Sequence, residues 1–448
     1  MRTSAAFIDT IYALATPYGR SGVAVVRVSG PGAADSLTLL TGDDHHLPRR
    51  AVLRVLRDPV TEAVIDQALV LFFSGPASYT GEDVVEYHLH GGVAVIDGLL
   101  AALARAPSHR MALPGEFTRR AFENGKMDLT AAEAVADLID AETEAQKQQA
   151  LSQMEGNLAR LYEDWRARLA KALAYAEALI DFSDEDLPDD VAAQVLPVIT
   201  ILQDEINAHL NDNRRGERLR NGIRVAVIGA PNAGKSSLVN ALAQRDVAIV
   251  SPLAGTTRDV IEAHLNIGGY PVILADTAGL RPEQLNETGH DAIESEGVKR
   301  ALKQAQSADI KLLLFDGTIV PDAATLALQD PTSILVYNKM DDEAQKPAAG
   351  QIYLSTKTGR GQAEFTRALT DKIKSILGTR SGPSLTRARH REALEQCADA
   401  LARAQNAPAA ELIAEDIRLA IRHLGHITGR VDVEDLLDII FRDFCIGK

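Results

Sequence analysis

The sequence Gly229-Ala-Pro-Asn-Ala-Gly-Lys235-Ser236 directly follows the apolar run Ile223-Arg-Val-Ala-Val-Ile228. It fits the phosphate-binding loop pattern G-x-x-x-x-G-K-[ST], in the strand-then-loop context that this pattern requires. Backbone N–H groups of such a loop surround phosphate oxygens, and the following helix directs its positive end at the same anion. We expect Lys235 to reach the β- and γ-phosphates and the Ser236 hydroxyl to bind Mg²⁺.

Further motifs, which together indicate a guanine nucleotide, follow in order. Asp276-Thr-Ala-Gly279 comes after a strand-like run, so its Asp suits Mg²⁺ and its Gly amide suits the γ-phosphate. The Asp of Asn338-Lys-Met-Asp341 can accept two hydrogen bonds from guanine, and adenine lacks that donor pair. Ser355-Thr-Lys357 suits the loop that contacts guanine O6. Gly255-Thr-Thr-Arg-Asp259 lies between the first two motifs and offers Thr257 as a second Mg²⁺ hydroxyl.

The residue after the Asp276-to-Gly279 motif is Leu280, where Ras-type GTPases place a water-orienting Gln. Leucine has no polar atom that orients water, so this group must come from elsewhere. No arginine finger is evident, and a monovalent cation near the β–γ bridge can replace the charge of an arginine. Asn232 and the loop Ser251-Pro-Leu-Ala-Gly255 offer oxygen ligands for it, although the residues alone leave Asn232 equally open as a turn residue.

Composition points to an ordinary globular protein of about two to four domains, because 46% of the 448 residues are hydrophobic and 24% charged. Asp9 interrupts the short apolar stretch at the N-terminus, and no apolar run approaches the ~18 residues that span a bilayer. The two cysteines, Cys397 and Cys445, argue against a disulfide scaffold or a zinc site. We therefore expect a cytoplasmic protein without membrane contact. The net charge of −15 offers nucleic acid no global basic field, so RNA contact requires a local patch or a partner's surface.

Hydrophobic periodicity indicates a helical region between two α/β regions. Residues 1–122 read as mixed α/β, with strands expected at 23–28 and 67–73. In residues 123–216, Thr130-Ala-Ala-Glu133 is a capping box that predicts a helix over 134–141. Apolar residues then recur every three or four positions from Leu151 to Ile180, which predicts one long helix.

A second helix is expected at 195–210, before the P-loop domain of residues 217–379. Strands and helices alternate in that domain, so its sheet should be mostly parallel. Residues 380–448 read as helical again, with an amphipathic helix at 434–444. The P-loop domain thus looks inserted into a discontinuous helical bundle.

Motifs from one end of the chain to the other are shared with one family. They are Asp9-Thr-Ile-Tyr-Ala-Leu-Ala-Thr-Pro17, Pro114-Gly-Glu-Phe-Thr-Arg-Arg-Ala-Phe122, Gly125-Lys-Met-Asp-Leu129 with Ala132-Glu-Ala134, Pro231-Asn-Ala-Gly-Lys-Ser-Ser237, Gly255-Thr-Thr-Arg-Asp259 and the terminal Cys445-Ile-Gly-Lys448. On these motifs the chain resembles the MnmE (also called TrmE) family of tRNA-modification GTPases over essentially its full length. The terminal motif is the most specific.

The resemblance implies a multidomain α/β architecture. Residues 1–122 would form an α+β domain that binds tetrahydrofolate and dimerises, residues 123–216 and 380–448 a discontinuous helical bundle, and residues 217–379 an inserted Ras-like G domain. It also implies a potassium-dependent GTPase that forms a homodimer and a heterotetramer with the FAD-dependent partner MnmG. Together they would add a carboxymethylaminomethyl or aminomethyl-type group to the 5-position of the wobble uridine of certain tRNAs, with the one-carbon unit from 5-formyl- or methylene-tetrahydrofolate.

By the same resemblance, individual residues acquire expected roles. The GTP-binding residues are Asn232, Ala233, Gly234, Lys235, Ser236, Ser237, Ser251, Pro252, Leu253, Ala254, Gly255, Thr256, Thr257, Asp276, Thr277, Ala278, Gly279, Asn338, Lys339, Asp341, Ser355, Thr356 and Lys357. The K⁺ ligands are Asn232, Ser251, the Leu253 carbonyl and Thr256, the Mg²⁺ hydroxyls belong to Ser236 and Thr257, and the folate contacts are Arg27, Glu86, Lys126 and Lys448.

Two expected roles keep alternatives. Glu294 matches the family's water-orienting Glu, but the segment 281–291 looks longer than usual, so Glu283, Glu287 and Glu296 stay rivals. Cys445 belongs either to a mobile tail that reaches the folate site across a dimer or to a small hydrophobic cap on the last helix.

A regulatory GTPase of ribosome assembly or translation is the competing hypothesis, because such proteins share the same nucleotide motifs. An assembly factor should carry a basic RNA-binding module. This chain is acidic instead and ends in Cys445-Ile-Gly-Lys448. The flanking regions therefore favour the tRNA-modification hypothesis.

Potassium dependence follows from Asn232 and from the missing arginine finger. We expect GTP hydrolysis to be faster in KCl than in NaCl, and Asn232→Ala to remove this difference while nearly preserving the affinity for GDP. Steady-state phosphate release in the two salts measures the effect. Equal rates in both salts for the native protein would contradict the prediction.

Overall fold

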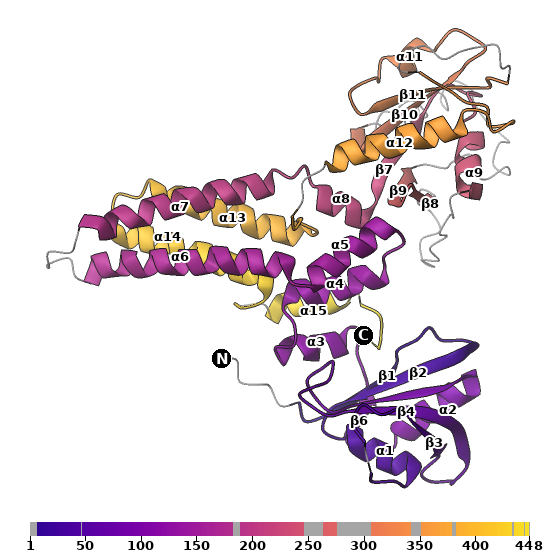
Figure 1. The fold of residues 1–448 in the computed structure, drawn as a ribbon, viewed down its shortest axis with the longest axis vertical. Coiled ribbons are helices and arrows are strands. Elements are labelled where there is room, and N and C mark those ends of the chain that lie inside the picture. Colours follow the sequence, from indigo (N-terminus) through magenta and orange to yellow (C-terminus); the bar gives the residue numbers. More distant parts are fainter. Residues whose placement is uncertain are drawn as a thin grey trace, which may run out of the picture. The chain divides into compact units, whose positions relative to one another are not determined.

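The structure is a computed structural model that describes residues 7–45, 47–181, 189–245, 263–275, 306–341, 351–378, 382–431, 434–442 and 444–447. The chain divides into two compact units (Figure 1). Unit 1 contains Met1–Ala136 and Gly425–Lys448, and unit 2 contains Asp137–Leu424. The two ends of the chain therefore belong to the same unit.

Unit 1 is built on a six-stranded sheet with strand order β3-β4-β5-β2-β1-β6. The strands are β1 Thr10–Leu14, β2 Ser21–Ser29, β3 Val52–Arg57, β4 Val64–Phe73, β5 Val84–Gly91 and β6 His109–Met111. Neighbours are antiparallel, except that β1 and β6 are parallel. The strands predicted at 23–28 and 67–73 are confirmed as parts of β2 and β4.

Apolar side chains on one face of this sheet pack against helices α1 Ala33–Thr41 and α2 Val93–Leu103. Val26 of β2 and Tyr87 of β5 are fully buried there, because alternate residues of a strand face the same side. The opposite face keeps charged side chains, including Arg27 and Glu86. The sheet thus has one apolar face and one face with polar groups.

A second cluster in unit 1 joins helices from both ends of the chain. These are α3 Glu116–Glu123, the first residues of α4 Leu129–Ile139, and α15 Glu434–Arg442. Phe122, Leu129 and Phe441 are buried in this cluster. The predicted amphipathic helix at 434–444 is confirmed, although it ends at Arg442.

The predicted capping box at Thr130 is wrong. Helix α4 begins at Leu129, and the Asp128 carboxylate accepts hydrogen bonds from the Thr130 and Ala131 backbone N–H groups. An Asp immediately before the first turn satisfies free helix N–H groups, so Asp128 takes the capping role.

The single long helix predicted from Leu151 to Ile180 is also wrong. The chain forms α5 Glu144–Met154 and α6 Asn157–Asp181, with Gly156 between them at a φ of +76°. A left-handed residue cannot continue an α-helix, and glycine adopts this conformation at little cost. The apolar spacing persisted across the break and concealed it.

The helical part of unit 2 contains α6, α7 Asp189–Leu210, α13 Ala388–Gln405 and most of α14 Ala410–Thr428 (Figure 1). The helix predicted at 195–210 is confirmed and begins earlier. Trp165 of α6 lies edge-on to His209 of α7, with ring centroids 5.6 Å apart. Burial lowers the pKa of His209 to about 4, so this side chain is neutral near pH 7.

The G domain of unit 2 has a six-stranded sheet with order β12-β11-β10-β7-β9-β8. The strands are β7 Ile223–Ile228, β8 Ala263–Ile267, β9 Tyr270–Ala275, β10 Ile310–Asp316, β11 Ser333–Asn338 and β12 Ile352–Tyr353. The described part of this domain also contains the helices α9 Lys235–Arg245, α11 Ala323–Leu326 and α12 Gln362–Leu377. All paired strands are parallel except β8 and β9, which confirms the predicted mostly parallel sheet.

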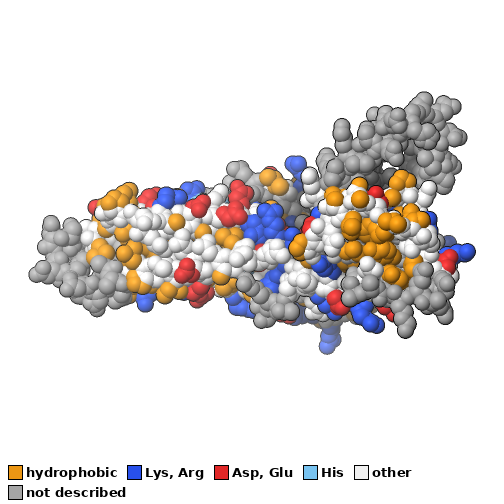
Figure 2. Space-filling view, turned by 90° about the horizontal axis from the view of Figure 1, so that it is seen from above, with side chains coloured by type: hydrophobic (Ala, Val, Ile, Leu, Met, Phe, Trp, Pro, Cys, Tyr) orange, Lys and Arg blue, Asp and Glu red, His pale blue; other side chains and the backbone are white. Residues whose placement is uncertain are grey.

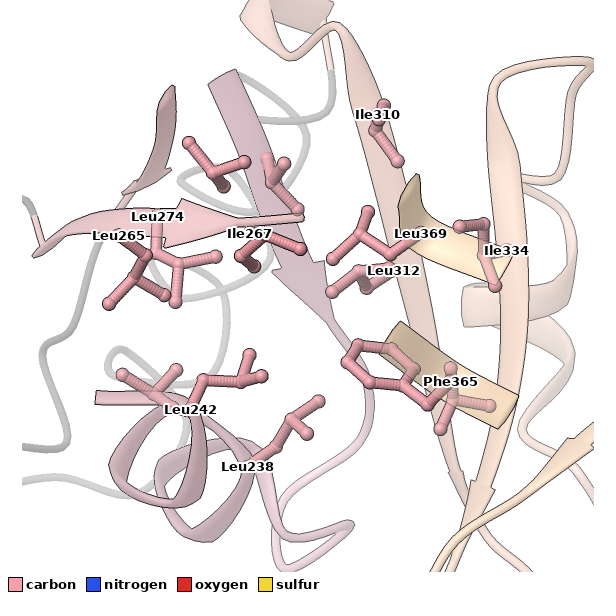
Figure 3. Close-up of a cluster of buried hydrophobic side chains, with 14 of the residues drawn as sticks. Leu238, Leu242, Leu265, Ile267, Leu274, Ile310, Leu312, Ile334, Phe365 and Leu369 are labelled. Atoms are coloured by element: carbon pink, nitrogen blue, oxygen red, sulfur yellow. The ribbon is translucent and has the colours of Figure 1, made fainter. Parts of the chain in front are cut away.

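The core of the G domain lies between this sheet and helices α9 and α12. Figure 3 shows Leu238 and Leu242 from α9 facing the strands, with Phe365 and Leu369 from α12 near Leu312 of β10. All five side chains are at most 2% exposed. This packing supports the loops at the carboxyl ends of β7 and β11.

Truncation of Phe365 tests this packing. We expect Phe365→Ala to lower the free energy of unfolding of the G domain by about 3–5 kcal/mol, because a large buried ring is lost and a cavity remains. Hydrogen exchange of the β7 and β10 amides in increasing urea measures it. As control, Ile319→Ala at a site 65% exposed should change stability by about 0.5 kcal/mol or less. Equal effects of both changes would contradict the assignment.

Candidate functional site

The predicted phosphate loop connects β7 to α9, as expected. Gly234 has a φ of +97°, and a Cβ there would lie 2.1 Å from Asn338 Nδ2, so only glycine fits. The Lys235 ammonium donates to the Gly229 carbonyl at 2.8 Å and to the Ala230 carbonyl at 3.0 Å. Burial lowers the pKa of Lys235. The loop thus holds a partly desolvated cation, an arrangement that favours an anionic ligand.

Asn338 joins the phosphate loop to the predicted base loop. This buried residue ends β11, and its Nδ2 donates to the Ala233 carbonyl at 3.1 Å. Its Oδ1 accepts from the Thr356 backbone N–H at 3.2 Å. One side-chain amide therefore uses both ends to tie together segments more than a hundred residues apart.

Asp341 lies beside this junction, and its carboxylate has a fixed orientation. Asp341 Oδ1 accepts from the Ser355 hydroxyl at 2.6 Å, and Ser355 Oγ accepts from the Thr358 backbone N–H at 3.0 Å. Among the described residues no donor binds Asp341 Oδ2. A fixed carboxylate with a free oxygen suits the paired N–H donors of guanine. The structure thus brings together Asn338, Asp341 and Ser355 as the sequence predicted.

Sequence reasoning missed the partner of Lys339. This residue has a φ of +64°, and its ammonium donates to Asp316 Oδ2 at 2.7 Å. The hydrogen bonds from Lys339 and Thr318 lower the pKa of Asp316 to about 2. The sequence did offer a signal for Asp316, because it stands at the carboxyl end of an apolar strand in the same parallel sheet.

Part of the predicted nucleotide site lies outside the described residues. This part comprises Ser251, Pro252, Leu253, Ala254, Gly255, Thr256, Thr257, Asp276, Thr277, Ala278, Gly279, Leu280, Glu283, Glu287, Glu294 and Glu296. Asn232 is described and has a φ of +64°, which asparagine tolerates better than most residues. In the described ranges, no group of three or more His, Cys, Asp or Glu side chains is arranged to hold a metal ion.

The predicted folate residues Arg27 and Glu86 pair across adjacent strands. Arg27 of β2 lies opposite Glu86 of β5, and its Nε and Nη2 donate to Glu86 Oε1 at 3.0 and 2.9 Å. The guanidinium also lies over the rings of Tyr79 and Phe117, at 5.4 and 5.7 Å from their centroids. Arg27 engages only Glu86 Oε1, and His88 Nε2 lies 3.5 Å from Glu86 Oε2.

The C-terminal segment contacts the same pair within unit 1. Arg27 Nη1 donates to the Gly447 carbonyl at 3.4 Å, and the Gly115 N–H donates to the Cys445 carbonyl at 3.4 Å. A Cβ on Gly447 would lie 2.3 Å from the Leu14 carbonyl oxygen, so the segment approaches β1 closely. Cys445 itself is exposed and is no buried cap on α15. Its reach across a dimer stays a prediction, and Lys448 lies outside the described residues.

Lys126 lies beside the loop that carries Tyr79. Its ammonium donates to the Pro76 carbonyl at 2.7 Å, and its side chain lies close to Gly81. The loop from 75 to 81 thus contacts Lys126 at its ends and Arg27 through Tyr79. Three of the four predicted folate residues, Arg27, Glu86 and Lys126, therefore lie around the loop from 75 to 81.

In unit 1, sequence reasoning also missed a buried ionic network. Arg120 is fully buried and pairs with Asp9 at 2.9 Å and with Glu82 and Glu116 at 3.2 Å. A second arginine, Arg110, also binds Asp9 and Glu116. Glu116 and Arg120 stand four residues apart on α3, a spacing that places them on the same helix face. Asp9 and Glu82 are far from Arg120 in sequence and follow no spacing rule.

Family models match both ends of the chain. The model described as "GTP-binding protein TrmE N-terminus" matches residues 10–126, and the model described as "MnmE helical domain" matches residues 129–445. No helix among the described residues is both long and apolar enough to cross a lipid bilayer.

Relatives match the chain over nearly its whole length. The tRNA modification GTPase MnmE of Parvibaculum lavamentivorans is 57% identical, over 98% of this chain and 100% of its own. The protein of the same name from Paramagnetospirillum magneticum is 52% identical over the same shares. The mitochondrial 5-taurinomethyluridine-[tRNA] synthase subunit GTPB3 of Danio rerio is 45% identical, over 98% of this chain and 93% of its own. The chain therefore belongs to the MnmE family of tRNA modification GTPases.

Proposed function

We propose that this chain hydrolyses GTP to support a modification at the 5-position of the wobble uridine of tRNA. The observation that carries the proposal is the Asp341 carboxylate, fixed by Ser355 beside a phosphate loop. The Danio rerio relative is named for a 5-substituted uridine in tRNA, which supports the same class of product. The added group would be of the carboxymethylaminomethyl or aminomethyl type.

Mg²⁺ and K⁺ are the ions that the nucleotide site requires in this proposal. The Ser236 hydroxyl at the start of α9 suits Mg²⁺, together with Thr257. Asn232 is placed in the phosphate loop, two residues before Gly234, and would share K⁺ with Ser251, Leu253 and Thr256. Glu294 remains our candidate for orienting the attacking water, because Leu280 has no polar atom for that role.

The residues around Arg27 and Glu86 are proposed to bind a reduced folate. Pterin offers amino and ring N–H donors, which suit Glu86 Oε2, and the folate tail offers carboxylates, which suit Lys126 and Lys448. A pterin ring would also find the partly buried aromatic side chain of Tyr79 beside Arg27. The folate would supply the one-carbon unit.

Partners complete the proposed reaction. We propose a homodimer that works with the FAD-dependent partner MnmG and with tRNA in the cytoplasm. The net charge of −15 makes unaided binding of an anionic tRNA unfavourable, so the partner should supply most of the basic surface.

Base selection can be tested at Asp341. Asp341→Asn should weaken GTP binding roughly 10²-fold and improve xanthosine triphosphate binding, because xanthine has an acceptor where guanine has its amino donor. Titrations with fluorescent analogues of both nucleotides measure the change. The exposed Asp371 of α12 gives a matched control, since Asp371→Asn should alter neither affinity. An unchanged affinity of Asp341→Asn for GTP would remove this residue from the base pocket.

Folate binding can be tested at Glu86 with 5-formyl-tetrahydrofolate as probe. Glu86→Gln should raise its Kd roughly tenfold or more, since the change removes a charged acceptor. On the same strand, His90 is 74% exposed and pairs with Asp66, so His90→Asn serves as a control with unchanged Kd. Calorimetry gives both values, and intact GTP binding shows that the variants fold. A native chain that fails to bind the probe would overturn the folate assignment.

A further inference from the structure

The chain passes between the helical part of unit 2 and the G domain twice. We call these two segments the crossings, and they contact each other. The chain enters through helix α8, Arg215–Asn221, and returns through the residues before α13. A Cβ on Gly216 would lie 2.2 Å from the Leu385 carbonyl oxygen, so the entering and returning segments are in direct contact. A conformational change that the polypeptide chain carries from the G domain to the helices must therefore pass through these two segments.

One carboxylate oxygen binds both crossings. Asp137 Oδ1, in the last turn of α4, accepts from Arg220 Nε at 2.8 Å and from Arg387 Nη2 at 2.8 Å. Arg220 is in the last turn of the entering helix, and Arg387 is the N-cap residue of α13. The Asp137 side chain is only 10% exposed, so water screens these contacts weakly.

A second arginine strengthens the junction from α13. Arg391 Nε donates to Glu217 Oε1 of α8 at 2.7 Å, and Arg391 Nη2 donates to Asp212 Oδ1 at 2.7 Å. Its Nη1 reaches the Leu210 carbonyl at the end of α7, at 2.8 Å. Both crossings are therefore fixed to the helices by charge-assisted hydrogen bonds, which are stronger than neutral ones.

Helix α8 is fixed to the G domain as well. Arg218 Nε lies 2.8 Å from Asp309 Oδ1, and the Arg224 backbone N–H at the start of β7 donates to Asp309 Oδ2 at 3.0 Å. Leu219 packs against the core of the G domain. Helix α8 is therefore bound both to the G domain and, through Arg220 and Glu217, to the helices. Helix α5 also contacts the G domain, where the Ala145 N–H donates to the Gly269 carbonyl at 3.2 Å.

A cavity lies at this meeting point. A cavity of about 160 Å³ is lined entirely by polar side chains, those of Asp137, Asp140, Gln146, Gln149, Arg220 and Asn221. Figure 2 shows basic and acidic side chains gathered on the visible face between the helices and the G domain. Apolar interdigitation, which would lock one arrangement, is absent from this lining. The orientation of α8 thus depends on directional ion pairs around hydratable space.

We propose that Asp137 is a positioning residue that sets the orientation of the G domain on the helices and so couples GTP hydrolysis to tRNA modification. Asp137 belongs to unit 2 and makes no hydrogen bond to the described residues of the nucleotide site. Its loss should leave the basal hydrolysis rate intact while the G domain samples a wider range of orientations.

Asp140 provides a matched control. It lies one turn from Asp137, lines the same cavity, and accepts no hydrogen bond from the described residues. Burial and the neighbouring Asp137 raise the pKa of Asp140. Arg220 and Arg387 also attract the Asp140 carboxylate. Asp140→Asn makes the same chemical change in the same cavity without breaking a hydrogen bond to either crossing.

The test measures distances between spin labels at Lys171→Cys on α6 and Ser375→Cys on α12, in a full-length Cys445→Ser background. Asp137→Asn should broaden the distance distribution, while Asp140→Asn should keep the width of the parent protein. In unlabelled chains with native Cys445, Asp137→Asn should retain the basal GTP hydrolysis rate and lower GTP-dependent tRNA modification roughly tenfold, within the usual range of coupling factors.

Two results would overturn the proposal: an unchanged distance distribution in Asp137→Asn, or equal broadening in Asp140→Asn. If Asp137→Asn does not fold, Arg387→Gln breaks the same contact from the other side and is held to the same criteria. Loss of hydrolysis together with modification would indicate a structural role instead. Because the distances need neither folate nor tRNA, a failed folate assignment leaves this test valid.

Discussion

The nucleotide site depends on the two hydrogen bonds of the buried Asn338 side chain. Its amide donates to the phosphate loop and accepts from the base loop, so both loops are held in register by one group. Gly234 must be glycine to let this amide approach. The parallel sheet makes the contact possible, since β7 and β11 bring their carboxyl ends to the same edge. A buried amide with both ends satisfied is strongly oriented, because any rotation leaves a polar atom unpaired.

Much of this site was predictable because its motifs are local. Each motif consists of a strand and the loop after it, so spacing alone placed Lys235, Asn338 and Asp341 at one edge. The prediction of one helix over 151–180 was wrong because hydrophobic periodicity does not reveal a single left-handed residue such as Gly156. The predicted N-cap residue of α4 was wrong by two positions for a related reason. Asp128 and Thr130 are both good capping residues, and only the backbone path decides between them.

The ionic networks could not be predicted from sequence. Arg120 forms ion pairs with Asp9, Glu82 and Glu116, which come from three separate segments of unit 1. In unit 2, Asp137 accepts hydrogen bonds from arginines of the two crossings, which lie far apart along the chain. Apart from Glu116 and Arg120, which stand four residues apart on α3, these contacts follow from tertiary packing and leave no periodic signal. The first network connects α3 to residues of the sheet domain, and the second holds the G domain to the helices.

The account as a whole rests on the identity of the nucleotide. The most direct measurement is the affinity of the native full-length chain for GTP and for ATP, each with Mg²⁺. Because adenine cannot supply paired donors to Asp341 and would leave its carboxylate unpaired, the account predicts that GTP binds roughly 10²-fold or more tightly than ATP. Equal affinities for the two nucleotides would contradict the account.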